Sequence, residues 1–147
     1  MVINNFQYYL DRSLVKKQSS NPEESKALLE KAKKRLKYIQ NQKITSEQAA
    51  FIFEDAYEVL REAAQSLMAI QGFKPYSHEA TISFIKEKSS SDFTEEDIYT
   101  FDRFRQLRNN AVYSAAPVEE EDVKDCILYA EKMIVIIERI THADNLL

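Results

Sequence analysis

The sequence predicts an all-α fold, an antiparallel up-and-down bundle of about five or six helices that forms a single domain over residues 1–147. Glycine and proline, which disfavour helix interiors, occur only once and three times, respectively. Hydrophobic residues make up 44% and charged residues 30% of the chain, a mixture typical of amphipathic helices. Apolar residues also recur at the spacing of a helical face, so no strand is expected.

The first two predicted helices flank a polar break at residues 19–21. The first is expected from Asn4 to Gln18, where apolar residues follow helical spacing. Asn21 is the expected N-cap of the second helix, Pro22 its first residue and Asn41 its approximate end. The second helix carries a dense run of basic residues, which we interpret as a solvated surface rather than a nucleic-acid patch: Lys31, Lys33, Lys34, Arg35 and Lys37.

The third and fourth predicted helices meet near the only glycine of the chain. The third begins at a capping box that starts with Thr45. It ends at Gly72, because glycine readily takes the left-handed conformation of a C-terminal cap. Ser77 is the expected cap of a shorter helix that ends near Lys88, and His78 at its start is interpreted as structural. A glycine-rich phosphate-binding loop is excluded.

Two further helices complete the predicted bundle. The fifth begins with a second capping motif, Thr94 and Asp97, and runs to about Ser114. Pro117 ends the connection to a last helix at about residues 118–143. The acidic first turn of that helix is interpreted as compensation of the helix dipole rather than as a metal site.

The apolar run at residues 133–137 is rich in β-branched side chains, which would also suit a strand. Its charged and helix-forming neighbours favour a helix that is buried on more than one side. The excess of apolar side chains could also serve a dimer face.

Composition excludes several classes of protein. The single Cys126 rules out an intramolecular disulfide framework, and we interpret it as a core residue. His78 and His142 are too far apart for a ligand motif, so neither a metal nor a cofactor is expected. No apolar run approaches the roughly 20 residues of a membrane span, and a signal peptide is lacking, so we expect a cytoplasmic protein without membrane attachment. The net charge of −4 means that nucleic-acid binding would need a local basic patch.

The fifth predicted helix concentrates cationic, amide and phenolic side chains. At about 100° per residue, Arg105, Asn109 and Tyr113 lie close to one line, with Arg108 about a sixth of a turn from Arg105. One interpretation of this polar stripe is a phosphate site, in which Arg108 offers a planar fork of donors and Asn109 an amide. The alternative is that Arg105, Arg108 and Asn109 pair with carboxylates such as those at residues 119–122, and that Tyr113 caps the core with its hydroxyl outward.

Three stretches resemble the HEPN domain family: residues 56–64, residues 72–80 and Leu107-Arg-Asn-Asn-Ala-Val-Tyr113. This all-helical family occurs in prokaryotic toxin-antitoxin pairs and other RNA-targeting systems. Its motif is arginine, usually a polar residue, a few more residues and then histidine. The resemblance implies a homodimer whose motif helices face one another and cleave RNA without a metal. Arg108 and Asn109 match the start of the motif, whereas Tyr113 stands at the histidine position.

The polar stripe and the resemblance together predict that Arg105, Arg108 and Asn109 bind RNA or a nucleotide. They also predict that Arg108 and Tyr113 are the catalytic residues of a metal-independent endoribonuclease, with Arg108 stabilising charge on the scissile phosphate. A phenol with a pKa of about 10 is a weak base at neutral pH, whereas histidine titrates near 6.5. Tyr113 is therefore expected to donate a proton or to orient the substrate.

The resemblance also implies a small nucleotidyltransferase partner. In some such systems the transferase modifies a tyrosine near the motif. Tyr113 is a candidate acceptor, although Ala115 occupies the position where that tyrosine is expected. The alternative function is a noncatalytic module for dimerisation and protein interaction, in which the polar stripe belongs to an interface.

Overall fold

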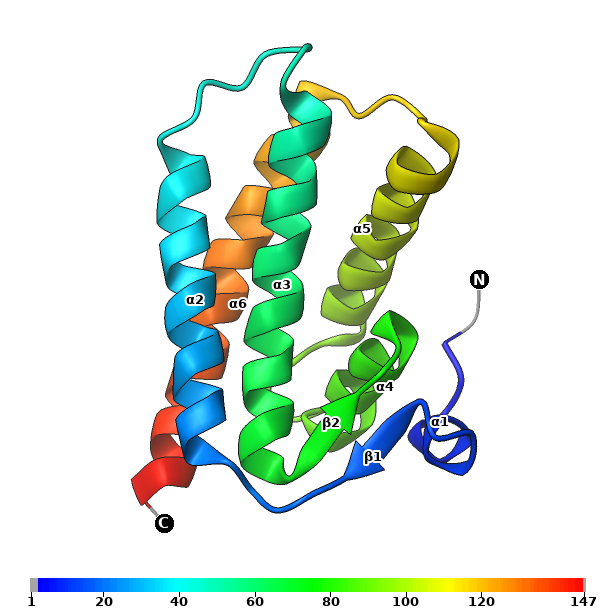
Figure 1. The fold of residues 1–147 in the computed structure, drawn as a ribbon, viewed down its shortest axis with the longest axis vertical. Helices are drawn as coiled ribbons and strands as arrows, with labels where there is room; N and C mark the ends of the chain where they lie inside the picture. Colours follow the sequence, from blue (N-terminus) through cyan, green and yellow to red (C-terminus); the bar gives the residue numbers. More distant parts are fainter. Residues whose placement is uncertain (1–2, 147) are drawn as a thin grey trace.

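The computed structural model describes residues 3–146 and forms an antiparallel helical bundle, which confirms the predicted fold class (Figure 1). The described elements are α1 (Phe6–Asp11), β1 (Val15–Lys17), α2 (Pro22–Gln40), α3 (Ala49–Gln71), β2 (Phe73–Pro75), α4 (His78–Lys88), α5 (Glu95–Ser114) and α6 (Glu120–Leu146). The four long helices, α2, α3, α5 and α6, run alternately up and down, and the shorter elements cover the lower end of the bundle.

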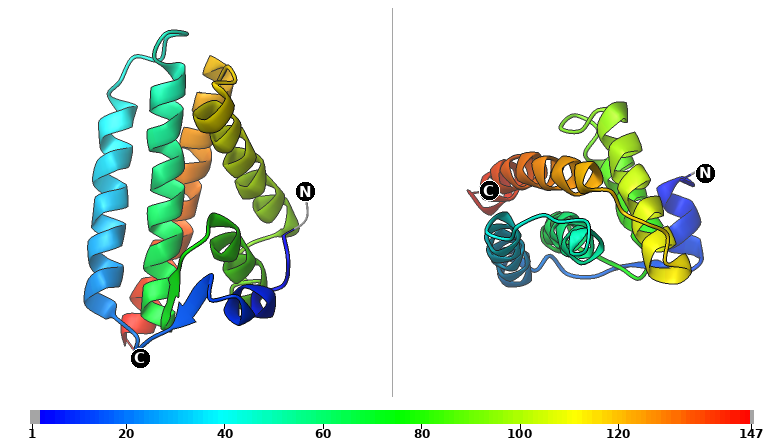
Figure 2. Two further views of the ribbon diagram at one scale, coloured as in Figure 1. Left: turned by 45° about the vertical axis from the view of Figure 1, so that its right-hand side comes forward. Right: turned by 90° about the horizontal axis from the view of Figure 1, so that it is seen from above.

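Helix α3 is the centre of the bundle. It contacts α2, α6, α4 and α5, and the view from above shows α2 on one side of it and α5 on the other (Figure 2). Because α3 has neighbours on most sides, its apolar residues extend around most of the helix. Its fully buried side chains include Phe53, Tyr57, Leu60, Leu67 and Met68.

Three predicted caps fix the starts of helices. The side chain of Asn21 accepts a hydrogen bond from the Glu24 amide at 3.0 Å, and Ser77 caps α4 in the same way. Thr94 and Asp97 form the predicted capping box at the start of α5. These caps satisfy backbone amides that lack partners within the helix.

Two helices begin later than predicted. Thr45 accepts a hydrogen bond from the Gln48 amide at 3.2 Å, but α3 itself starts at Ala49. Likewise, α6 starts at Glu120, two residues after the expected position at Val118. A turn at residues 46–48 precedes α3, so its capping signal marks the approach to the helix.

Gly72 ends α3 as predicted, and two features require glycine there. Its φ angle is +86°, in the left-handed region that side chains disfavour. A Cβ atom at this position would also lie 2.7 Å from the backbone oxygen of Gln18. The close approach of these two backbone segments brings β2 beside β1.

The prediction for the N-terminal segment was wrong, because a helix and a strand replace the single helix expected from Asn4 to Gln18. Helix α1 ends at Asp11, and the chain turns at Ser13, whose φ is +56°. Residues 15–17 then pair antiparallel with residues 73–75, although no strand was expected. The backbone hydrogen bonds of β1 go to this distant segment, and Val15 is buried in the core.

Helix α6 contains the apolar run at residues 133–137, which confirms the helical interpretation of this run. Met133, Ile134 and Ile137 are buried, whereas Val135 is 59% exposed. Cys126 is also buried in this helix, as predicted. Within residues 3–146, no helix combines the length and apolar composition needed to cross a bilayer.

Candidate functional site

Helix α5 carries the predicted site residues, and aromatic packing fixes its position. Phe104 lies between α3 and α6, with ring centroids 6.0 Å from Phe53 and 6.1 Å from Tyr129. Phe101 makes an edge contact with Tyr57 of α3 at 6.2 Å. These contacts anchor the middle of α5, so the side chains one turn further along it are held at defined places.

Arg105 lies in the protein interior rather than on an exposed polar stripe. Its side chain is only 3% exposed, because it follows the buried Phe101 by four residues and shares that face of α5. It donates hydrogen bonds to Asp102 at 2.8 Å and to Glu79 of α4 at 3.3 Å. Arg105 thus joins α4 to α5 through two ion pairs, one to the mostly buried Asp102 and one to Glu79, whose side chain is 42% exposed. The predicted RNA contact would require these carboxylates to be displaced.

Arg108 differs from the other arginines of α5 in its partners. It is half-buried, its NH1 group donates to the Asn109 side chain at 3.3 Å, and its guanidinium lies 6.0 Å from the Tyr113 ring centroid. Within the described part of the chain, no carboxylate pairs with Arg108. Arg103, by contrast, reaches Asp122 at 3.9 Å. The alternative interpretation expected Arg105 and Arg108 to pair with carboxylates: Arg105 does so with Asp102 and Glu79, whereas Arg108 does not among the described residues.

Tyr113 lies near the end of α5 and is 78% exposed. With Arg108 and Asn109 it forms a cluster of three predicted site residues within two turns of helix. The guanidinium, the amide and the phenol provide donors for phosphate and ribose oxygens. We call these three residues the motif cluster.

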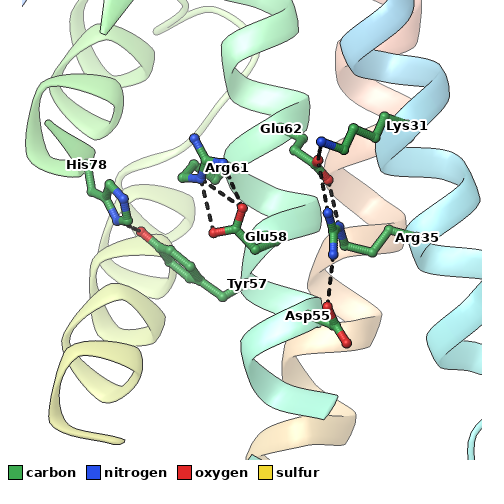
Figure 3. Close-up of polar contacts among 8 residues, drawn as sticks. All are labelled: Lys31, Arg35, Asp55, Tyr57, Glu58, Arg61, Glu62 and His78. Carbon is green, nitrogen blue, oxygen red and sulfur yellow. Dashed lines mark hydrogen bonds and ion pairs between the residues drawn. The ribbon is translucent and has the colours of Figure 1, made fainter. Parts of the chain in front are cut away.

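A second group of polar side chains was not predicted as part of the site. It lies on α3 and at the start of α4, and we call it the Tyr57–His78 group: Tyr57, Glu58, Arg61 and His78 (Figure 3). The Tyr57 hydroxyl and Nδ1 of His78 are 3.1 Å apart, and either atom donates depending on the tautomer of the imidazole. Arg61 pairs with Glu58, with its NH2 group 2.6 Å from the carboxylate.

The charge of Arg108 acts on two members of the Tyr57–His78 group. Burial lowers the pKa of His78, and the charge of Arg108 lowers it further. Burial raises the pKa of Tyr57 well above its usual range, against the opposing charges of Arg105 and Arg108. Burial alone would raise the pKa of Glu58, but its hydrogen bond with Arg61 outweighs burial and lowers it. His78 is therefore neutral and Tyr57 a protonated phenol at neutral pH.

The basic run of α2 forms ion pairs with carboxylates of α3 and α6, which favours its interpretation as a helix surface rather than a nucleic-acid patch. Arg35 binds Glu62 and Asp55, each at 2.9 Å, and Lys31 reaches Glu62 at 3.4 Å (Figure 3). Lys33 pairs with Glu138 of α6. These carboxylates neutralise much of the basic run.

Other parts of the structure hold no group of predicted site residues. A cavity of about 570 Å³ lies between the end of α4 and the start of α5, and Lys86, Phe93 and Tyr99 are among its lining residues. Over the described residues, no three histidine, cysteine, aspartate or glutamate side chains gather as metal ligands.

Sequence reasoning missed the Tyr57–His78 group because its members come from separate helices. The available signal was that Tyr57 and His78 fall within two of the three stretches that carry the family resemblance. Helical periodicity instead assigned Tyr57 to the core, which is correct for its ring, and His78 to a helix start. Only the hydrogen bond between the two residues reveals a polar group at this place.

Comparison with models of known protein families matches residues 25–140 to the HEPN domain. This range contains the motif cluster, Arg105 and the Tyr57–His78 group. A search of curated proteins gave no match.

Proposed function

The chain belongs to the HEPN domain family, and from this premise we propose that it binds RNA or a nucleotide through Arg108 and cleaves RNA without a metal ion. We place it in a prokaryotic toxin-antitoxin or nucleotidyltransferase-associated system. Family membership supplies the class of ligand, and the motif cluster supplies the groups that would bind it.

The observation that carries this proposal is the uncompensated charge of Arg108. A half-buried guanidinium has lost part of its hydration, and an anionic partner normally restores that loss. Arg103, Arg105, Arg61 and Arg35 each have a carboxylate partner, but within the described residues Arg108 has none. A phosphate group would supply the anionic partner that Arg108 lacks, because the planar guanidinium binds two phosphate oxygens at once.

Each residue of the motif cluster has a separate role in the proposed phosphate binding and cleavage. Arg108 stabilises the negative charge that develops on the scissile phosphate. Asn109, which already contacts Arg108, holds the guanidinium and offers its amide to a neighbouring oxygen. Tyr113 donates its phenolic proton or orients the substrate. For Arg105, whose guanidinium is engaged by Asp102 and Glu79, we propose an indirect role in which it positions α4 and α5.

We further propose that the protein is a homodimer. Val112 and Tyr113, beyond Arg108 on α5, are 39% and 78% exposed. A second copy contacting this end of α5 would cover both side chains and bring two Arg108 residues together. Two guanidinium groups would attract an RNA phosphate more strongly than one.

The proposed partner is a small nucleotidyltransferase. Helix α6 exposes Leu128 at 63% and Val135 at 59%, seven residues apart and thus on one face. An apolar face of this kind is suited to a protein partner. Coexpression with a transferase from the adjacent reading frame, followed by affinity purification, would show copurification that Leu128→Asp abolishes.

The primary experiment compares RNA cleavage by the natural protein with cleavage by Arg108→Ala. Purified protein is incubated with mixed structured and single-stranded RNAs in chelator, and products are resolved by length. Arg103→Ala is the matched control, because it removes a partly exposed arginine from the same helix. Loss of cleavage in Arg108→Ala alone supports the proposal, and intact RNA in all samples contradicts ribonuclease activity.

The second candidate function is a noncatalytic interaction module. It is favoured by the exposed apolar side chains at the end of α5 and on α6. In this function Arg108→Ala would weaken assembly, and no cleavage would be present to lose. Native mass measurement of the natural protein and of this variant distinguishes the two functions.

A further inference from the structure

The ribbon formed by β1 and β2 presents two lysines directly opposite one another. Lys16 pairs with Lys74 in the antiparallel register, and both side chains are exposed. Side chains at directly opposed positions lie on the same face of a ribbon, and like charges placed there are destabilising. Within the described part of the chain, neither ammonium group has a carboxylate partner. The described residues therefore leave a local repulsion unrelieved.

One carboxylate lies near the ribbon but does not neutralise it. Glu24 of α2 and Lys74 line the same small cavity of about 50 Å³. The Glu24 carboxylate accepts a hydrogen bond from the Asn21 side chain at 3.3 Å and forms no ion pair with Lys74. Because Glu24 belongs to the first turn of α2, its charge also serves that helix. The charge of Lys74 thus stays available to an external anion.

The ring of Tyr76 lies close to both ammonium groups. Its centroid is 5.4 Å from Nζ of Lys16 and 6.0 Å from Nζ of Lys74, and Tyr76 is 56% exposed. Tyr76 follows Lys74 by two residues, so the pleat places both side chains on the same face. Cation–π contacts at exposed sites are weak, so they explain neither the facing lysines nor the exposed ring. We call Lys16, Lys74 and Tyr76 the ribbon patch.

The other face of the ribbon packs on the core, which holds the ribbon patch in place. Val15 is buried, and the ring centroid of Phe73 lies 5.6 Å from that of Phe84 in α4. The Tyr76 amide donates to the Leu14 carbonyl at 2.8 Å, so pairing continues to the base of the Tyr76 side chain. The ribbon lies at the lower end of the bundle, where β2 leads into α4 (Figure 1). A rigid element of this kind keeps the three side chains together.

We propose that the ribbon patch binds single-stranded RNA: Lys16 and Lys74 bind backbone phosphates, and Tyr76 stacks on a base. Single-stranded RNA offers both chemistries at once, because its phosphates are charged and its unpaired bases have accessible faces. A phosphate beside the two ammonium groups would replace their repulsion with attraction. This inference rests on the proposed function, and it adds a second contact for RNA, away from Arg108, that selects unpaired bases.

An anionic membrane would also offer phosphates, but the ribbon patch lacks the apolar side chains that enter a bilayer. Among the large hydrophobic residues that are exposed in the described structure, Tyr76 is the only one in or next to β1 and β2. Surfaces that lie on a membrane bury a broad apolar face. Stacking on a base needs only one aromatic ring, which favours RNA.

The first test measures binding of a single-stranded 2′-O-methyl oligouridylate, whose methylated 2′-oxygen prevents cleavage. Fluorescence anisotropy gives the association constant over a range of salt concentrations. Lys16→Ala and Lys74→Ala should each reduce the slope of log association constant against log salt by about 0.7, the value of one phosphate contact. Lys17→Ala is the matched control and should change the slope little. It removes the same charge from β1 but lies opposite Phe73, on the other face of the ribbon from Lys16.

The second test examines stacking by Tyr76. Tyr76→Ala should weaken binding of the single strand by about tenfold, whereas Tyr76→Phe should bind as the natural protein does, because stacking uses the ring and not the hydroxyl. A 2′-O-methyl duplex of the same length should respond to the lysine variants but not to Tyr76→Ala, because its bases are already stacked on one another. Equal losses in Tyr76→Ala and Tyr76→Phe would overturn the stacking role.

Lys74→Glu separates binding from folding. It replaces the repulsion across the ribbon with an ion pair to Lys16, so the urea midpoint of unfolding should rise slightly. RNA binding should nevertheless fall by about tenfold or more, because a cation that contacts phosphate becomes an anion. A lower urea midpoint would show that the two lysines do not repel each other, and would remove the basis of the proposal.

The outcomes separate this inference from the proposed function. If Arg108→Ala weakens RNA binding while the ribbon-patch variants bind like Lys17→Ala, the ribbon patch is not an RNA site, and the role of Arg108 stands. If only the ribbon-patch variants weaken binding, the ribbon patch stands and the role of Arg108 is wrong. Binding to vesicles of equal parts phosphatidylcholine and phosphatidylserine, with no binding to RNA, would overturn both.

Discussion

Arg35 of α2 donates two hydrogen bonds to Glu62 of α3, at 2.9 Å and 3.3 Å, although the Glu62 side chain is only 2% exposed (Figure 3). A carboxylate removed from water in this way needs a partner, because burial of an unpaired charge is costly. Arg35 also binds Asp55, so one guanidinium holds two carboxylates of α3. The pair therefore fixes how α2 and α3 face one another.

Arg35→Ala should lower the free energy of unfolding by about 2 kcal/mol, because it leaves the Glu62 carboxylate buried with only Lys31 nearby. Lys31→Ala is the matched control, since that side chain is 64% exposed and its loss should cost less than about 1 kcal/mol. Urea denaturation monitored by circular dichroism gives both values. Equal effects of the two variants would mean that Glu62 is not preferentially held by Arg35.

Two arginines of α5 should behave oppositely when changed to alanine. Arg105→Ala removes the buried partner of Asp102 and Glu79, and should destabilise the fold by about 3 kcal/mol. Arg108→Ala removes a cation that has no carboxylate partner among the described residues, and should change stability by less than about 0.5 kcal/mol. Urea denaturation gives the free energy of unfolding of both variants. A large loss of stability in Arg108→Ala would identify Arg108 as a structural residue.

The helical parts of the fold could be predicted from local sequence because their signals are local. Asn21, Ser77 and Thr94 bind backbone amides three residues away, and Gly72 ends α3 through its own backbone conformation. The strand at residues 15–17 depends on a partner nearly sixty residues later, so neighbouring residues gave no sign of it. The apolar residues of the N-terminal segment happen to have the spacing of a helical face, which led to the prediction of a helix there.

Only part of the candidate site could be predicted from the sequence, for a related reason. Spacing along one helix brought Arg108, Asn109 and Tyr113 together correctly, because all three belong to α5. The same spacing could not show that α4 covers Arg105 with Glu79, which makes that residue internal. His78 was also assigned to structure alone, since its contact with Tyr57 joins separate helices.

Asp97 should make stability depend on pH in the acidic range. Burial alone would raise its pKa, but hydrogen bonds from Lys132 and Thr94 outweigh burial and lower the pKa. A lowered pKa in the folded state means that the carboxylate contributes stability above its unfolded pKa of about 3.9, and that this contribution is lost as pH falls through the folded value.

Asp97→Asn should therefore cost about 1 kcal/mol at neutral pH and flatten the stability profile below about pH 4. Urea denaturation at a series of pH values measures both effects. Lys132→Ala is the control: it removes one partner, at 2.8 Å, and leaves the capping bonds of Thr94, so its effect should be smaller. An identical pH profile for Asp97→Asn and the natural protein would contradict this account.

Cys126 should resist thiol reagents in the folded protein. It is fully buried in α6, and burial raises the pKa of its thiol far above the ordinary range, so little thiolate forms. A chromogenic disulfide reagent should react slowly in buffer and rapidly in denaturing urea. Rapid reaction in buffer would show that α6 opens readily at this point.

Tyr113→His should increase RNA cleavage if the proposed function is correct. The side chain is 78% exposed, so the change should leave stability within about 0.5 kcal/mol of the natural value. It replaces the phenol beside Arg108 with an imidazole, and histidine is the side chain best suited to exchange protons near neutral pH. General acid-base catalysis by a positioned histidine contributes about 100-fold or more, so cleavage in chelator should rise by a factor of that order.

The pH–rate profile is the decisive measurement. The new histidine titrates in the neutral range, so the rate of Tyr113→His should change with pH across that range, whereas the rate of Tyr113→Phe should not show this change. A rate that is unchanged in Tyr113→His would mean that residue 113 does not reach the reacting atoms.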